Sequence, residues 1–127
     1  MIAKKHELDE VPNPRVGLAS VNEVHLVGRL SRTAVERVMP SGDVLCSFRV
    51  VVQRLEADSA GRRRVDALDC HTWSARVRKQ ALGWREGDIV ELHGALRRRF
   101  FRTAAGTQSM TEVEVLSARV VRRASSA

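Results

Sequence analysis

The reactive side chains of this sequence gather around residue 70, where Asp69, Cys70 and His71 follow one another. A cysteine beside a histidine has the residue types of a nucleophile and its general base. Successive side chains of a strand point to opposite faces of a sheet, so Cys70 and His71 cannot pair if this segment is a strand. We therefore expect no nucleophilic enzyme site here.

Other motifs of enzymes and cofactor sites are missing. The sequence has no C-x-x-C, no glycine-rich phosphate loop followed by Lys and Ser or Thr, and no G-x-S-x-G. Its four histidines, His6, His25, His71 and His93, show no spacing typical of a metal site. The sequence thus predicts a protein that is not an enzyme and that holds no cofactor and no metal.

Positive charge is the second feature with chemical meaning. Lys and Arg number 22 against 15 Asp and Glu, for a net charge of +7, and only three of the 22 are Lys. The arginines form runs at 62–64, at 97–99 with Arg102, and at 122–123 with Arg119. A single run is typical of a solvated surface. Three runs of Arg, which binds phosphate as a planar fork and stacks on bases, favour an anionic partner, first of all nucleic acid.

Two strand faces combine charge with aromatic rings. Alternation places Arg97, Arg99 and Phe101 on one side of a strand, which is typical of a single-strand groove with cations for phosphates and a ring for a base. Trp73 shares its face with Asp69 and His71, and this pattern alone leaves a core role and a stacking role equally open. Phe100 has the opposite parity and is expected to pack, and Trp84 is expected to plug the core.

The elements that carry these residues are short strands. Alternating apolar residues predict strands over 23–30, 44–53, 65–73, 89–96 and 110–121, with a turn at 40–42, a helix at 74–83 and a basic hairpin tip at Arg62 and Arg63. Five strands with a helix between the third and fourth predict an all-β, five-stranded OB-fold barrel. A sandwich or another small barrel remains the alternative. Residues 1–21 are predicted to be a flexible N-terminal segment, 22–121 the domain and 122–127 a short basic tail.

Alternation also predicts the core. Val44, Cys46, Phe48, Val50 and Val52 share one face of the second predicted strand, with Arg49 on the other. Leu68, Cys70 and Thr72 point inward from the third strand. Val90, Leu92, Gly94 and Leu96 point inward from the fourth, with Ala95 outward.

Length and composition exclude other classes. With 127 residues the chain is long enough for one domain, and no apolar run approaches the 18 residues of a membrane span. Two cysteines make no disulfide framework. The N-terminus lacks the apolar stretch of a signal peptide and is too acidic for a mitochondrial presequence. These features favour a cytoplasmic protein.

From residue 21 onward the sequence resembles the bacterial single-stranded DNA-binding proteins. The resemblance covers about 100 of the 127 residues and is carried by segments in the family's order: NEVHLVGRL (22–30), PSG (40–42), FRV (48–50), LDCHTW (68–73), GDIVELHGALR (87–97) and TEV (111–113). No single segment is specific, but the series is.

The resemblance implies an OB-fold that assembles as a homotetramer and coats single-stranded DNA in replication, recombination and repair, in the nucleoid. It places Trp73 and Phe101 at stacking positions and Arg97 and Arg99 on the binding face. The predicted nucleic-acid-binding residues, from pattern and resemblance together, are Trp73, Phe101, Arg97, Arg99, His71, Arg49, Arg62 and Arg63.

The sequence departs from the family pattern in three ways. Ala67 stands where many members have an aromatic residue, and Asp69 places an anion on the DNA-binding face. The chain ends without the acidic tip through which members recruit other proteins, so we do not expect such recruitment. Ala67 and Asp69 favour weaker binding of DNA. Such weak binding favours an accessory or primosomal interaction subunit as an alternative function. An RNA-binding OB domain is a further alternative, because single-strand grooves also accept RNA.

Overall fold

The computed structural model describes residues 19–57 and 59–125, without the side chains of Ala57 and Arg63. This part of the chain contains five strands and one helix, in the predicted order. They are β2 (Val24–Val38), β3 (Val44–Ala57), β4 (Arg63–Thr72), α2 (Ala75–Ala81), β5 (Ile89–Thr103) and β6 (Gly106–Arg122).

The strands close into a barrel in the order β2-β3-β4-β6-β5. Residues 24–29 of β2 lie antiparallel to β5, and residues 29–38 lie antiparallel to β3. A short parallel contact between β4 and β6 closes the barrel, with Cys70 beside Val113 and His71 beside Glu114. The predicted five-stranded OB-fold with one helix between its third and fourth strands is confirmed.

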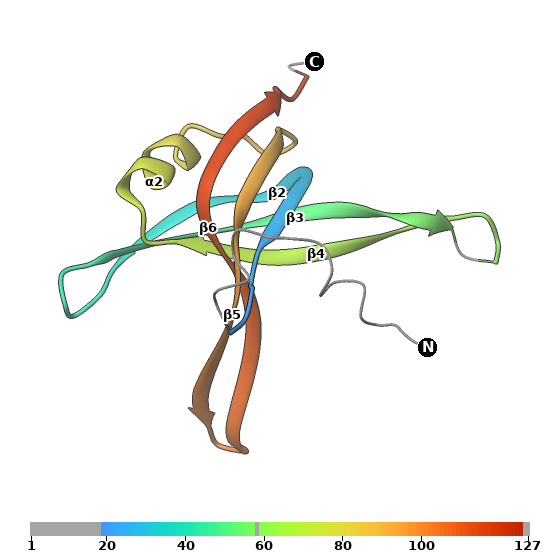
Figure 1. Ribbon diagram of the computed structural model, residues 1–127. Coiled ribbons are helices and arrows are strands. Elements are labelled where there is room, and N and C mark those ends of the chain that lie inside the picture. The colour runs from blue at the N-terminus through green and yellow to red at the C-terminus, as the bar shows by residue number, and fades with distance from the viewer. Residues whose placement is uncertain (1–18, 58, 126–127) are drawn as a thin grey trace.

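The β3–β4 and β5–β6 hairpins extend beyond the barrel, as the β2–β3 hairpin does on the left (Figure 1). β3 and β4 form the arm that runs to the right, and β5 and β6 form the arm that runs downward. The helix α2 lies near the end of the molecule opposite the β5–β6 turn. The strands of both arms present side chains to solvent on both faces, so the arms add surface to the barrel rather than core.

Alternating residues of the strands fill the barrel. Cys46, Phe48 and Val50 of β3 are buried, as are Cys70 and Thr72 of β4. Leu30, Val90, Leu92, Val113 and Val115 complete the centre of the core, with Val52 and Leu68 packed against it. The predicted inward face is therefore confirmed for β3 and β4. Burial of these aliphatic side chains is the main stabilising term for such a barrel.

The helix closes one end of the barrel. Ser74 caps it, because its Oγ accepts a hydrogen bond from the backbone N–H of Val77 at 3.2 Å. Val77 and Ala81 are buried beneath it. Trp84 follows the helix, is 5% exposed and meets Phe48 edge-on with ring centroids 5.2 Å apart. The predicted role of Trp84 as a core plug is confirmed.

The structure corrects three details of the pattern. β2 continues to Val38 and β5 to Thr103, because cross-strand backbone pairing extends strands whose side chains carry no apolar signal. Leu96, predicted to be inward, is 48% exposed where β5 leaves the barrel, while Ala95 is 5% exposed. Phe100, predicted to pack, is 64% exposed with the Arg98 guanidinium 5.5 Å from its ring centre.

Among the described residues, no helix is both long and apolar enough to cross a membrane.

Candidate nucleic-acid interface

One outer face of the barrel collects most of the predicted binding residues. Trp73 follows the last residue of β4, between two residues that fix the backbone. The buried Thr72 hydroxyl donates to the carbonyl of Val115 at 2.8 Å and accepts from the N–H of Ser74 at 3.0 Å. Because Thr72 points inward and Ser74 starts the helix, Trp73 faces outward with 45% of its surface exposed. The sequence left open whether Trp73 is a core residue or an exposed one, and in the structure Trp73 is exposed.

Trp73 lies in a hollow of about 280 Å³ that we call the Trp73 hollow. Side chains from β3, β4, β5 and β6 line it, namely Leu45, His71, Trp73, Arg97, Arg99, Glu112 and Glu114. Four predicted binding residues, two of them cations, are therefore brought together around one indole ring. A hollow with a ring and guanidinium groups suits a base stacked on the ring beside its phosphate.

Acidic side chains underlie the arginines of this hollow. Arg97 Nε donates to Glu114 Oε1 at 2.7 Å, and Arg99 Nη2 donates to Glu112 Oε2 at 3.0 Å. The side chains of Glu112 and Glu114 are 13% and 17% exposed, whereas those of Arg97 and Arg99 are 52% and 55% exposed. The carboxylates thus hold the guanidinium groups in place from below and leave them open to solvent.

His71 is less accessible than its face suggested. Its side chain is 12% exposed, and its buried Nδ1 lies 2.9 Å from Glu112 Oε1 in a contact without hydrogen-bond geometry. His71 therefore forms part of the floor of the Trp73 hollow, next to Glu112. The guanidinium groups of Arg97 and Arg99 are more accessible to solvent than this ring.

A second hollow of about 480 Å³ adjoins the first and is called the Arg49 hollow. Its lining comprises Arg32, Val35, Ser47, Phe48, Arg49, Asp69, Cys70, Met110 and Glu112. Arg49 Nε donates to Asp69 Oδ1 at 2.8 Å, across the β3–β4 register that pairs these two residues. Asp69, the departure from the family pattern, is thus a partner of a predicted binding arginine. Glu112 lines both hollows, so the two are neighbours on the surface.

Phe101 is outside both hollows. It lies on the β5–β6 arm opposite Gln108 and is 38% exposed. Arg62 lies exposed at the far end of the β3–β4 arm, and the side chain of Arg63 is outside the described residues. Phe101 and Arg62 therefore lie along the arms and do not meet around Trp73.

Sequence reasoning missed several lining residues. Glu112 and Glu114 alternate with the buried Val113 and Val115, so period two could have placed them on the outer face. Their contacts with Arg97 and Arg99 depend on the β5–β6 register, which pairs Arg97 with Glu112 and Ala95 with Glu114. Alternation also places Leu45 on the face of Arg49, whereas Arg32 and Met110 have no local signal that would have identified them.

A close approach of two strands sets this register. Between His93 and Gly94 the pairing with β6 moves from Ser117 to Val115, so Leu116 is an extra residue in β6. A Cβ atom at position 94 would lie 1.8 Å from the backbone oxygen of Glu114. Only glycine permits this approach, and the approach places Glu114 beside Arg97.

Cys70 lies in the core beneath the outer face that carries the two hollows, and its thiol is unreactive. It is 2% exposed, and burial, with smaller contributions from Asp69 and Glu112, raises the pKa of its thiol to about 12. A thiol with this pKa stays protonated at neutral pH and is a poor nucleophile. This agrees with the expectation that Asp69, Cys70 and His71 form no reactive site.

Comparison with protein families identifies the chain's relatives. The model of the single-strand binding protein family matches residues 21–122. The chain is 30% identical over 98 residues to single-stranded DNA-binding protein A of Bacillus subtilis, covering 76% of this chain and 57% of that protein. It is 32% identical over 94 residues to the single-stranded DNA-binding protein of Oceanobacillus iheyensis, covering 73% and 58%. The chain thus spans somewhat more than half the length of these relatives.

Solved structures share the fold at low sequence identity. The Plasmodium falciparum SSB in complex with ssDNA superposes with a TM-score of 0.66 at 18% identity, covering 81% of this chain and 95% of that one. The mitochondrial single-stranded DNA binding protein Rim1 of S. cerevisiae gives a TM-score of 0.64 at 9% identity, covering 82% and 98%. These likenesses support the OB-fold of the barrel.

Proposed function

Because the chain belongs to the single-strand binding protein family, we propose that it binds and coats single-stranded DNA with little sequence preference. The relatives it matches are named single-stranded DNA-binding proteins. The family consists of binding proteins, in agreement with the prediction that this chain is not an enzyme.

The observation that carries the proposal is the exposed indole of Trp73 in one hollow with the guanidinium groups of Arg97 and Arg99. A ring that is 45% exposed on the outer face of a folded barrel is available to a ligand. Every base has a flat face that can stack on it, so the contact tolerates any sequence. Arg97 and Arg99, which line the same hollow, lie where the phosphates flanking a stacked base would be neutralised.

The path of the strand follows the two hollows. A DNA strand with one base stacked on Trp73 has the Arg49 hollow next to it, where Arg32 and Arg49 supply two more cations. Phe101 and the basic tip with Arg62 would extend the path along the arms. Four arginines and three carboxylates line the two hollows, which are therefore only weakly positive, so stacking carries much of the affinity.

We further propose that the protein acts as a homotetramer in DNA replication, recombination and repair, in the cytoplasm at the nucleoid. One feature of the single chain supports assembly. Residues 24–28 of β2 pair with β5 on one side, and within the described residues their other edge has no β-ladder partner. Val27, in this segment, is 47% exposed. Such an edge invites pairing with another copy. Light scattering that gives the mass of one chain at micromolar concentration would contradict the tetramer.

A second function is favoured by the same carboxylates. If Asp69, Glu112 and Glu114 keep the arginines occupied, DNA binding is weak and the chain serves as an accessory subunit that docks on replication proteins. An RNA-binding role uses the same hollow and differs only in the ligand.

One titration separates these functions. Fluorescence anisotropy follows a labelled oligonucleotide of the same sequence as DNA and as RNA, each at two salt concentrations. Tight DNA binding that weakens with salt supports the coat protein. Tighter binding of RNA favours the RNA-binding role, and negligible binding of both at low salt favours the accessory subunit.

A further inference from the structure

Two histidines and a glutamate meet on the barrel surface, away from both hollows. His25 of β2 and His93 of β5 are direct cross-strand partners, and Glu91 precedes His93 by two residues on the same face of β5. Their spacing along the chain gave no sign of a metal site, because 66 or more residues separate His25 from the other two. The antiparallel pairing of β2 with β5 is what brings them together.

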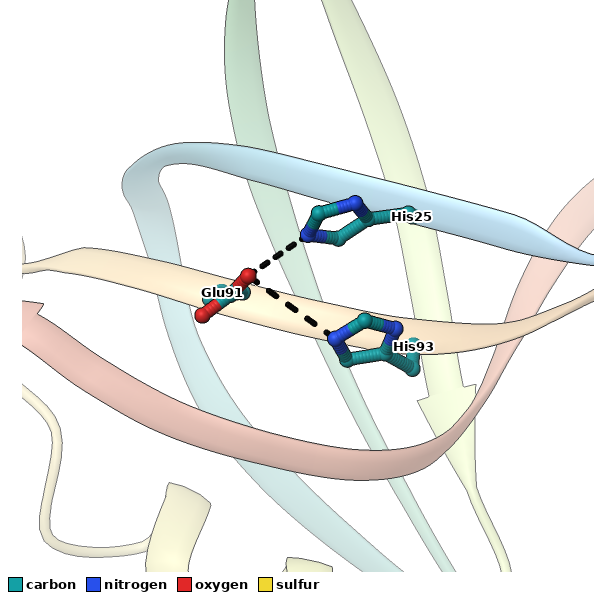
Figure 2. A group of neighbouring side chains, drawn as sticks. All are labelled: His25, Glu91 and His93. Atoms are coloured by element: carbon teal, nitrogen blue, oxygen red, sulfur yellow. Dashed lines mark hydrogen bonds and ion pairs between the residues drawn. The ribbon is translucent and has the colours of Figure 1, made fainter.

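The three side chains present their ligand atoms to one another. Figure 2 shows the two imidazole rings with one oxygen of Glu91 facing both. His25 Nε2 lies 2.6 Å from Glu91 Oε2, and His93 Nε2 lies 3.8 Å from the same oxygen. The rings are nearly parallel, at an interplanar angle of 8° with centroids 4.3 Å apart. One atom from each residue lies within 4.8 Å of the others.

A fourth residue orients the carboxylate. Arg119 of β6, the register partner of Glu91, donates from Nε to Oε1 at 2.7 Å. This bond leaves Oε2 turned toward the histidines. A hydrogen bond to the non-ligating atom of a metal ligand is the usual way in which a protein orients that ligand.

We propose that His25, Glu91 and His93 bind a zinc ion through Nε2, Oε2 and Nε2. Zinc takes imidazole nitrogens and carboxylate oxygens at about 2.0–2.2 Å, which places tetrahedral ligand atoms about 3.3 Å apart. The observed separations, from 2.6 Å to at most 4.8 Å, bracket that value. The histidine side chains are 57% and 54% exposed, so small rotations can make their lone pairs converge.

Zinc binds a ring nitrogen that carries no hydrogen, so His25 would bind through Nε2 with its hydrogen on Nδ1. The ion would then replace the 2.6 Å contact between His25 Nε2 and Glu91 Oε2. Arg119 stays on Oε1. The fourth coordination position faces solvent and is filled by water, so one ion binds per chain and fastens β2 to β5.

Zinc binding by the whole chain tests this site directly. Protein freed of metal with a chelator is titrated with zinc chloride by calorimetry, and with Co²⁺ followed by visible absorption, which is far stronger for four-coordinate than for six-coordinate Co²⁺. We expect one ion per chain, a strong visible Co²⁺ band and a higher melting temperature in zinc. The Co²⁺ band reports the ligand geometry without any variant.

Matched variants assign the ligands. His25→Gln, His93→Gln and Glu91→Gln should each weaken zinc binding at least about tenfold, and Arg119→Gln about 10- to 100-fold, as for residues that orient ligands. The control is His71→Gln, which removes a histidine that is not part of the cluster and should leave zinc binding within about twofold. Circular dichroism verifies that each exposed-residue variant is folded.

Three results would overturn the proposal. These are no binding of either ion by the wild-type chain, equal binding by the ligand variants and the control, and half an ion per chain. The last would place zinc between two copies. None of these outcomes depends on DNA binding, so the zinc site and the proposed function are tested separately.

Discussion

Replacing Trp73 by Ala removes the ring on which the proposed DNA-binding function depends most. A base stacked on an aromatic side chain contributes about 1–3 kcal/mol, so we expect the dissociation constant for an oligonucleotide to rise about 5- to 160-fold. Loss of a fully buried Trp costs about 3–5 kcal/mol of folding free energy. Trp73 has 45% of its surface in water already. Scaled by the buried share of its surface, its loss should therefore cost at most about 3 kcal/mol of stability.

Trp84 provides the matched control, because the sequence has only two tryptophans and they occupy opposite environments. Trp84 is 5% exposed against Phe48. Trp84→Phe keeps an aromatic ring in the core and makes Trp73 the sole indole. DNA should quench the emission of this variant as strongly as that of Trp73 in the wild type, whereas Trp73→Ala should lose most of the quench.

The assay is titration of each variant with one oligonucleotide, followed by anisotropy and by indole emission, with a thermal melt of each protein. Trp73→Phe should lie between wild type and Ala in affinity, because a smaller ring still stacks. If Trp73→Ala binds DNA within about twofold of wild type and its melting temperature falls as far as for a core substitution, Trp73 is not the stacking platform.

Four further predictions concern the charges of the two hollows, the close approach of Gly94 to β6 and the buried thiol of Cys70. Glu112→Gln keeps a hydrogen-bond acceptor for Arg99 but removes a charge about 6–8 Å from a bound phosphate, so affinity at low salt should rise by about 0.5–1.4 kcal/mol, or about 2- to 10-fold; an unchanged affinity in a low-salt titration would contradict this. Wild-type affinity should fall with salt with a slope of about −2.8 in a double-logarithmic plot, at about −0.7 for each of four arginines in the hollows, and a flat plot would remove the electrostatic contribution. Gly94→Ala should cost at least about 3 kcal/mol in denaturant unfolding, because its Cβ would meet the Glu114 backbone at 1.8 Å, whereas Gly83→Ala, with its nearest atom at 3.5 Å, should be tolerated. Cys70 keeps its proton in the folded state up to a pKa of about 12 but loses it above about 9 when unfolded, so the free energy of unfolding should fall between pH 9 and 12 and Cys70→Ala should flatten that fall; a variant with the wild-type pH profile would exclude this cause.

The amino-acid composition makes the contribution of Cys70 to stability at high pH easy to separate from that of other groups. The sequence contains no tyrosine and only three lysines, so few other groups titrate in that range. Burial also raises the pKa of the Cys46 thiol, which makes Cys46→Ala a useful second variant. Both substitutions can be compared at neutral pH first, where any loss of packing is measured separately.

The sequence by itself determined the fold class and the faces of the strands. Alternation in 44–52 and 68–72 correctly assigned Phe48, Cys70 and Thr72 to the core and put Trp73 on the opposite face, but it left the burial of that ring open. This works because a pleated strand turns each successive side chain to the other face, which is a local property of the backbone. Turn and helix signals are local for the same reason, so the order of the five strands and the helix was predictable.

Only the tertiary structure decided which side chains of different strands meet. The Leu116 bulge and the approach of Gly94 to β6 place Glu114 against Arg97, and the β2–β5 register places His25 beside His93. The burial of β5 also depended on where the barrel ends, which exposes Leu96 and Phe100 against expectation. Register is fixed by hydrogen-bond ladders between segments far apart in sequence, and a shift of one residue would turn every partner to the opposite face.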